Sequence, residues 1–328
     1  GVYHAKDLIY YYNDLPPFSE RSYTIGDRVA LIGVGNVMAD MARWLVRDVK
    51  VDEVIGVARR GPAEVKFTSR ELGYSASNLD VDALKAEIDR VRDRMEAVGQ
   101  DPEEAKAFIL SALEHAPPAV SDTRLRFRFL SAMGRILDDG EGHVGGLEVE
   151  NTRLVRDEGG RTRPERLGTT HVLDVDTVIF CIGDRVSEDL GLPVENFSYC
   201  KHPYPDYAVD GVCYEAYDPQ VEDALEDVFL VGWAREASAG QVGLARKDAK
   251  GCAEAVKAYL DEEGMGEMRD SDPHAALEQR LAALDHPVID KADWHHLEEA
   301  EAQEAERRGV APFKYETNEA MLAAIGKG

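Results

Sequence analysis

A short apolar run that stops at two glycines constrains the fold of this chain most strongly. Residues 29–32 read VALI and are followed by Gly33 and Gly35. Apolar residues then recur at helical spacing, at Val37, Met41, Trp44 and Leu45. The pattern predicts a strand, a tight glycine turn and a helix.

The two glycines have the positions that a dinucleotide-binding turn requires. In such a unit the first glycine makes the turn and the second lets the backbone approach a pyrophosphate, while the helix N-terminus offers free N–H groups to the anion. Gly33 and Gly35 fit these roles. The third small residue of the fingerprint should fall at Met38, beside Ala39, so we expect helix and strand to pack differently here.

A second predicted strand, over residues 53–58, ends in Arg59 and Arg60. In NAD sites this strand ends in an acidic residue that binds the ribose 2′-hydroxyl, whereas guanidinium groups there can clamp a 2′-phosphate. The arginine pair therefore favours NADP(H) over NAD(H). The alternative is a solvated Arg-Arg turn ahead of Gly61 and Pro62.

Three segments, GVGNVMAD, ARRGPAEVKFTSREL and GWAREASAGQVG, resemble the adrenodoxin-reductase type of ferredoxin–NADP reductase, in the FAD-dependent pyridine nucleotide oxidoreductase superfamily. The resemblance implies an α/β fold with a Rossmann-like three-layer NADP-binding domain and the C-terminal part of a split FAD-binding domain. It also implies contacts with NADP from Asn36, Val37, Arg59, Arg60 and Glu71. Contacts with flavin and nicotinamide are implied for Gly232, Trp233, Gly240 and Val242, although Gly240-Gln241-Val242 stands where the family has Gly-Val-Ile.

The resemblance sets the expected domains. We place a connecting segment at residues 1–26, the NADP(H)-binding domain at 27–184, and the C-terminal portion of the FAD-binding domain with a helical extension at 185–328. In the family a glycine-fingerprint half that holds the FAD adenosine comes first, and nothing ahead of Asp27 supplies one. We therefore expect the chain to lack the N-terminal FAD-binding half, either as a fragment or because a separate polypeptide carries that half.

Further elements are expected along the chain. The only literal GxGxxG, at residues 140–145, leads into a strand and is interpreted as a turn without a phosphate site. One strand is predicted over residues 171–181 and a long loop over 197–219. A buried strand at 227–231 is expected to deliver Gly232 and Trp233 to a sheet edge, ahead of a helix whose N-terminus faces flavin.

Composition excludes several function classes. There are 63 acidic and 38 basic residues and the net charge is −25, which disfavours binding to nucleic acid or an anionic membrane. No apolar run is long enough to span a membrane, so we expect a cytoplasmic protein. The four cysteines lie far apart and are predicted to be reduced, partly buried thiols. Without a neighbouring cysteine pair, a thioredoxin-reductase type of chemistry is disfavoured.

A half-buried strand is predicted where arginine alternates with apolar residues, at residues 124–129. Its side chains Arg124, Arg126 and Arg128 are interpreted either as a basic patch for an acidic electron carrier or as a solvated strand face.

The function that the resemblance implies is that of an NADPH-dependent flavoprotein oxidoreductase, passing electrons from NADPH through FAD to a ferredoxin or another iron–sulfur carrier. Hydride transfer needs positioning more than acid or base chemistry, so no catalytic side chain and no metal ligand is nominated. Two alternatives stay open: an electron-transfer module resembling the small subunit of glutamate synthase, and a flavin-free NADP(H)-binding module.

Overall fold

The chain forms two compact units. The computed structural model describes residues 1–236, 242–263 and 273–328. Unit 1 comprises Gly1–Ile182 and Ile289–Gly328, and unit 2 comprises Gly183–Val288. In this division residues 1–26 and residues 289–328 both group with the expected NADP(H)-binding domain, and the boundary between the units falls after Ile182.

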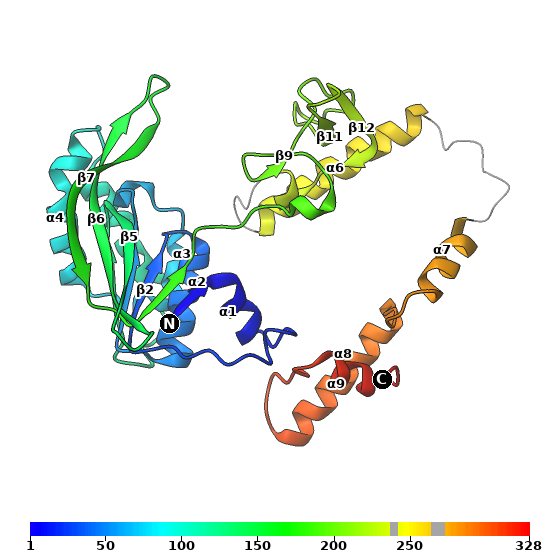
Figure 1. Ribbon diagram of the computed structural model, residues 1–328, viewed down its shortest axis with the longest axis horizontal. Coiled ribbons are helices and arrows are strands. Elements are labelled where there is room, and N and C mark those ends of the chain that lie inside the picture. Colours follow the sequence, from blue (N-terminus) through cyan, green and yellow to red (C-terminus); the bar gives the residue numbers. More distant parts are fainter. Residues whose placement is uncertain (237–241, 264–272) are drawn as a thin grey trace. The chain divides into compact units, whose positions relative to one another are not determined.

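A parallel sheet forms the centre of unit 1 (Figure 1). Its strand order is β1 (Val2–His4), β8 (Thr177–Phe180), β2 (Arg28–Ile32), β3 (Glu53–Val57) and β4 (Arg124–Arg128). All neighbouring pairs run parallel. The middle strand β2 carries the fully buried residues Val29, Ala30 and Leu31, as the apolar run predicted. The expected α/β fold with a Rossmann-like parallel sheet is confirmed.

Helices cover one face of this sheet. They are α1 (Ala5–Tyr12), α2 (Asn36–Trp44) with its π-helical continuation η1 (Leu45–Val49), α3 (Ser69–Ala76), α4 (Val81–Glu96) and α5 (Pro102–Leu110), with the 3₁₀ turns η2 (Pro62–Glu64) and η3 (Ser111–His115). Their apolar residues, among them Met41, Leu72 and Ile88, join the buried face of the sheet in one core. Burial of these apolar side chains contributes most of the free energy that stabilises the helices.

The other face of the sheet is covered by an antiparallel meander. Its strands are β5 (Ser131–Asp138), β6 (Val144–Arg156) and β7 (Thr162–Leu173). Leu147 and Val149 pack with Ala30, Ile55 and Val57 in a second core. Helices, parallel sheet and meander together make the three layers.

Two expectations about this region have different outcomes. The GxGxxG stretch is the turn between β5 and β6, with Gly140 and Gly142 at positive φ, as predicted. The single strand predicted over 171–181 is wrong, because the chain ends β7 at Leu173 and begins β8 at Thr177. Between them the Asp176 carboxylate accepts hydrogen bonds from the N–H groups of Asp27 and Arg28, which redirects the chain from the meander into the parallel sheet.

The missing third small residue of the glycine fingerprint is compensated on the neighbouring strand. Met38 is fully buried on α2. A Cβ atom at Gly56 of β3 would lie 3.7 Å from the Met38 sulfur and 3.0 Å from the Phe127 ring. Gly56 therefore provides the space that a small residue at position 38 would have provided.

Unit 2 is built from short elements. They are η4 (Glu188–Leu190), β9 (Val194–Glu195), β10 (Ser198–Tyr199), β11 (Glu215–Asp218), β12 (Asp223–Phe229), η5 (Gly232–Ala234), α6 (Val242–Glu263) and α7 (Pro273–Ala282). The loop predicted over 197–219 contains β10 and β11, so that prediction is wrong in part. The buried strand predicted at 227–231 is correct in part, because β12 ends at Phe229 and Leu230 is buried, but the strand begins at Asp223 and none of its own residues is buried. Within the described residues, β12 pairs antiparallel with β11 alone and exposes Asp223, Glu226 and Asp227.

The last part of the chain contains α8 (Lys291–Arg308) and α9 (Asn318–Ala324). Asp290 and Asp293 form a capping box at the start of α8, and Lys327 pairs with Asp293. Lys314 pairs with the buried Glu301, so each buried carboxylate of α8 has a cationic partner. No helix within the described ranges is both long and apolar enough to cross a membrane.

Candidate nucleotide site

Gly33 adopts a backbone conformation that only glycine tolerates here. Its φ is +122°, and a Cβ atom would lie 2.4 Å from the carbonyl oxygen of Cys181 at the end of β8. Its N–H donates to the Val57 carbonyl at 2.9 Å. The turn after β2 is therefore held by the strands on both sides of it.

Gly35 differs from Gly33, because the space around it is open. It is the N-cap residue of α2, with φ −108° and ψ −175°. The heavy atom closest to a Cβ at this position would be Cβ of Lys66, at 3.8 Å. Gly35 has no side chain to cap α2, so the first N–H groups of the helix point into this space. That arrangement suits an anion.

Asn36 joins two helix N-termini. Its side-chain carbonyl oxygen accepts a hydrogen bond from the Thr68 N–H at 3.0 Å, and the Thr68 hydroxyl in turn caps α3 by accepting from the Glu71 N–H at 3.2 Å. The fold thus uses the Asn36 oxygen and leaves its NH₂ group for a ligand. Val37 is 37% exposed in the first turn of α2.

The two arginines after β3 have different surroundings. Arg60 donates to the Thr162 carbonyl at 2.9 Å and pairs with Glu64 at 3.3 Å, so it ties the end of β3 to β7. The exposed side chain of Arg59 makes no hydrogen bond or ion pair within the described part of the chain. Of these two arginines, Arg59 can therefore bind an anion without giving up a partner, whereas Arg60 cannot.

Glu71 lies in the first turn of α3, near the α2 residue Asp40. Desolvation and the negative charge of Glu71 raise the pKa of Asp40 above its ordinary value. A second anion such as phosphate would be repelled by this pair, so Glu71 fits an acceptor for hydroxyl or amide groups.

Sequence reasoning missed Lys66, although it lies inside the segment that carries the family resemblance. The Lys66 N–H donates to the Val34 carbonyl at 2.8 Å, which places this exposed residue beside the glycine turn. Its ammonium group has no ion pair in the ranges that the structure describes. The available signal was its position two residues before Thr68, the N-cap of α3.

Replacing Lys66 with glutamine is expected to weaken NADPH and NADH binding to the same extent, by about fivefold or more, because an interaction with pyrophosphate is common to both nucleotides. Equilibrium titration of each nucleotide measures the two ratios. The exposed Lys85, paired with Asp82 on α4, provides the matched control, Lys85→Gln. A loss confined to NADPH would instead assign Lys66 to the 2′-phosphate.

In unit 2 the expected flavin-facing residues Gly232 and Trp233 form the turn η5. Gly232 has φ +62° and no heavy atom within 4 Å of a would-be Cβ. Its N–H donates to the Asp248 carboxylate of α6 at 2.6 Å, and Arg235 donates to the same carboxylate at 2.5 Å. Trp233 is 55% exposed. The turn thus holds an aromatic ring on the surface.

The Asp248 side chain is only 14% exposed, and the side chain of its partner Arg235 is 11% exposed. Burial acts to raise the pKa of Asp248, but the hydrogen bonds from Arg235 and Gly232 outweigh it and hold the pKa below its ordinary value. A carboxyl with a depressed pKa in the folded state stabilises the fold above its unfolded-state pKa, and that stability is lost as pH falls through the folded-state value.

Replacing Asp248 with asparagine is expected to loosen the η5 turn and to destabilise unit 2 by about 1.5–3 kcal/mol, the worth of hydrogen bonds to a charged group. Tryptophan fluorescence during denaturant unfolding measures this. Acidification below about pH 4 should cause a similar loss in the parent protein and much less in the variant. An equal acid response of both proteins would contradict this role of Asp248.

The structure says less about Gly240 and Val242, the other residues that were expected to face flavin. Gly240 lies outside the described residues, and Val242 is the first residue of α6.

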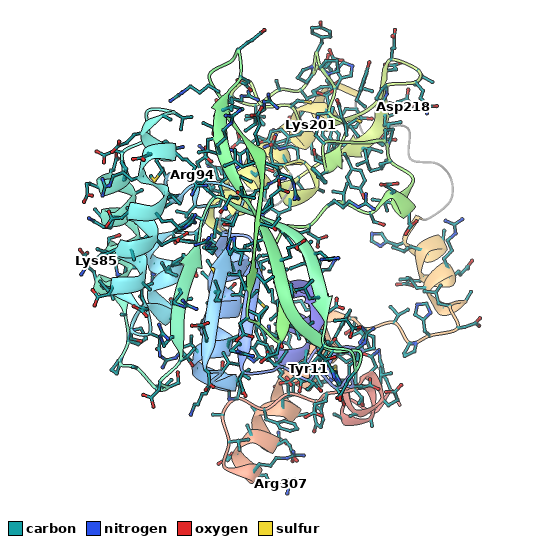
Figure 2. All side chains as sticks on the ribbon, turned by 60° about the vertical axis from the view of Figure 1, so that its left-hand side comes forward. Tyr11, Lys85, Arg94, Lys201, Asp218 and Arg307 are labelled. Atoms are coloured by element: carbon teal, nitrogen blue, oxygen red, sulfur yellow. The ribbon has the colours of Figure 1, made fainter. Side chains whose placement is uncertain are left out.

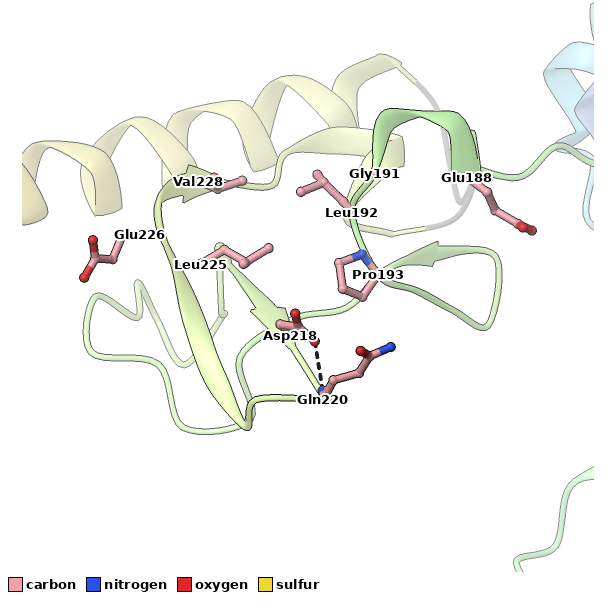
Figure 3. A pocket seen from close by; sticks show the side chains of 9 residues that line it. All are labelled: Glu188, Gly191, Leu192, Pro193, Asp218, Gln220, Leu225, Glu226 and Val228. Carbon is pink, nitrogen blue, oxygen red and sulfur yellow. Dashed lines mark hydrogen bonds between the residues drawn. The ribbon is translucent and has the colours of Figure 1, made fainter.

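A cavity of about 570 Å³ in unit 2 has an apolar floor at Leu192, Leu225 and Val228 (Figure 3). Its lining also includes the acidic residues Glu188, Asp218 and Glu226. This charge disfavours the phosphates of a dinucleotide there.

The interpretation of the β4 arginines as a solvated strand face is correct in part, because the Arg124 side chain is 59% exposed, whereas those of Arg126 and Arg128 are 35% and 22% exposed. Arg124 pairs with Asp80 at 2.8 Å, Arg126 with Glu53 at 2.6 Å and Arg128 with Glu87 at 3.5 Å. Arg126 and Arg128 line a cavity instead of an open surface. Each of the three arginines already has a carboxylate partner, which argues against a docking patch for an acidic carrier.

The cysteines are free thiols, and Cys181, Cys200 and Cys252 are buried, as the sequence indicated. Burial raises the pKa of each of these thiols, so none is activated as a nucleophile.

Comparisons with known proteins found similar sequences and a similar solved structure. No family model matches the chain. It is 27% identical to the NADPH-ferredoxin reductase FprA of Mycobacterium leprae, a match covering 100% of this chain and 73% of that protein. The mitochondrial NADPH:adrenodoxin oxidoreductase of Salvelinus fontinalis is 22% identical over 94% of this chain and 65% of its own length. The structure of Mycobacterium tuberculosis FprA in complex with NADPH superposes with a TM-score of 0.75 at 25% identity, covering 99% of this chain and 73% of the other.

These relatives carry the matched region within a single longer chain, of which this chain spans about three quarters. That finding does not support the expectation of a separate polypeptide for the FAD-binding half. Along its whole length, the chain is a homologue of the NADPH-ferredoxin reductases of the FprA and adrenodoxin reductase type.

Proposed function

We propose that this chain binds NADPH and acts as an oxidoreductase that passes electrons from NADPH through FAD to a ferredoxin-type iron–sulfur protein. The observation that carries the proposal is the open glycine turn at Gly35, next to the N-termini of α2 and α3, with the unpaired Arg59 at the end of β3. The relatives named NADPH-ferredoxin reductase support it.

Each residue of the turn receives a role in nucleotide binding. Gly33 shapes the turn, and Gly35 lets the pyrophosphate approach the N–H groups of α2. Asn36 donates from its free NH₂ group, and Val37 packs against the nucleotide. In the same way Arg59 binds the 2′-phosphate, with Arg60 as a nearby positive charge, and Glu71 accepts from ribose or carboxamide.

The η5 turn of unit 2 fits a flavin ring. Gly232 leaves open space, and the half-exposed Trp233 offers a flat aromatic surface for stacking. We include Gly240 and Val242 in this site on the family resemblance alone. FAD, when bound, accepts a hydride from NADPH and releases its electrons singly to an iron–sulfur centre. The protein's contribution is to position the two ring systems, which needs no acid or base side chain.

We also propose the electron acceptor and the cellular location of the reaction. The acceptor is a ferredoxin or another iron–sulfur carrier, as the names of the relatives suggest, and the location is cytoplasmic. The flavin-free module and the module resembling the small subunit of glutamate synthase remain the rival functions.

Anaerobic mixing of the protein with FAD and NADPH, followed by an oxidised [2Fe–2S] ferredoxin, tests the proposal. NADPH should bleach the visible flavin absorbance, and ferredoxin should restore it as the ferredoxin becomes reduced. A protein that binds NADPH but never bleaches added flavin would be the flavin-free module. Flavin reduction without electron delivery to any ferredoxin would favour the module resembling glutamate synthase.

A further inference from the structure

A second cavity lies in unit 1, between α4, β4 and β7, and shares no residue with the nucleotide turn. Its volume is about 350 Å³, and its polar lining consists of Glu87, Arg90, Arg126, Arg128 and His171. On β4, arginine alternates with the buried Leu125 and Phe127, so the arginines face the meander, where β7 carries His171.

The carboxylates near this cavity are already occupied. Arg90 donates to both oxygens of Glu87, at 2.7 and 2.6 Å, and the Phe129 N–H donates to the same carboxylate at 2.6 Å. Glu53 pairs with Arg126 at 2.6 Å. Three guanidinium groups therefore face two carboxylates. Arg94 adds a further cation where α4 meets β6, through its bond to the Thr152 carbonyl at 2.8 Å (Figure 2).

Several polar atoms around the cavity are buried without a partner. In the described part of the chain, the Nε atoms of Arg126 and Arg128 and both ring nitrogens of His171 make no hydrogen bond. A guanidinium keeps its proton in proteins, so these N–H groups remain donors without an acceptor. An unpaired buried donor destabilises the folded state because it has lost its hydrogen bonds to water. The cavity thus supplies three guanidinium groups and several unpaired donors, while the carboxylate in its lining, Glu87, is already engaged by Arg90, Arg128 and the Phe129 N–H.

We propose that this cavity binds a small oxyanion, a phosphate or sulfate group, held by Arg126, Arg128 and His171. Such an anion offers several acceptor oxygens and neutralises the excess charge of the arginines. The volume of about 350 Å³ exceeds what one such group needs, so the anion is either free phosphate or the phosphate of a small organic phosphomonoester.

Thermal unfolding of the full chain at constant ionic strength tests the proposal, with inorganic phosphate as the probe. Low millimolar phosphate should raise the Tm of the parent protein until the site is saturated. The expected rise is about 2–4 °C for each kcal/mol by which phosphate binding stabilises the folded state. Arg128→Gln should abolish this rise. Arg124→Gln is the matched control, because Arg124 lies on the same strand but outside the cavity and should keep the full rise.

Two further measurements show where the phosphate binds and which kind of phosphate the cavity prefers. Arg59→Gln should retain the phosphate response, whereas loss of the response in this variant would place the anion at the nucleotide turn and overturn the proposal. Glycerol 3-phosphate is titrated in parallel. If glycerol 3-phosphate binds more tightly than inorganic phosphate, the ligand is an organic phosphomonoester. If the two bind equally, the ligand is the free anion. Either result supports a phosphate group bound in the cavity.

A direct readout uses the parent protein and does not depend on the variants. Burial and the charges of Arg128 and Arg90 lower the pKa of His171, and Glu87 opposes them. A bound anion offsets these cations and should raise that pKa in an NMR titration of ¹⁵N-labelled histidine, with the signal assigned through His171→Gln. If millimolar phosphate leaves both the His171 titration and the Tm unchanged, the cavity binds water only and the proposal is wrong.

Discussion

Replacing Arg59 with alanine is expected to weaken NADPH binding by roughly ten- to a hundredfold and to leave NADH binding almost unchanged. A hydrogen bond to a charged group is worth about 1.5–3 kcal/mol, and each 1.4 kcal/mol is about tenfold in affinity. NADH lacks the 2′-phosphate, so it loses nothing. Raised salt should reproduce part of the loss, because Arg59 is exposed and its charge is screened.

Arg60→Ala should behave differently. Because Arg60 already binds the Thr162 carbonyl and Glu64, its removal should lower the free energy of unfolding and reduce NADPH affinity less than Arg59→Ala. Parallel titrations of NADPH and NADH, with denaturant unfolding of each variant, measure these effects. The exposed Arg163, paired with Glu165 on β7, supplies the control Arg163→Ala. An unchanged NADPH-to-NADH affinity ratio in the Arg59/Arg60 double variant would remove the basis for the NADP assignment.

The second large effect is expected at the two glycines of the turn, where alanine should act on different properties. Gly33→Ala forces an unfavourable φ and a clash with the Cys181 carbonyl, so we expect destabilisation by roughly 2–6 kcal/mol. Gly35→Ala should change stability by only about 1 kcal/mol, because its extended backbone suits any residue. Its methyl group, however, enters the space kept for pyrophosphate, so nucleotide affinity should fall by at least about tenfold.

Denaturant unfolding and nucleotide titration of both variants separate the two roles. The pair is internally controlled, since the same methyl group is added two residues apart. If Gly35→Ala binds NADPH as tightly as the parent protein, the pyrophosphate does not lie over this turn. A Gly33→Ala protein of normal stability would show that β8 does not constrain the turn as described.

Local sequence patterns determined much of the nucleotide-binding unit. The apolar run at 29–32, the glycines at 33 and 35 and the helical periodicity after them predicted β2, the turn and α2, because strand burial, turn conformation and amphipathic helix formation depend on nearby residues. The position of Arg59 and Arg60 after β3 also follows from local spacing.

Only the tertiary structure decided which side chains are free. Arg59 and Arg60 are equivalent in the sequence, yet Thr162 on β7 engages Arg60 alone. Gly56 accommodates Met38 from a different strand. The arginines of β4 looked solvent-facing from alternation, but their carboxylate partners Glu53 and Glu87 come from β3 and α4. Such pairings join residues distant along the chain, and no local period encodes which cation meets which carboxylate, so the packing of the sheet, α4 and the meander determines them.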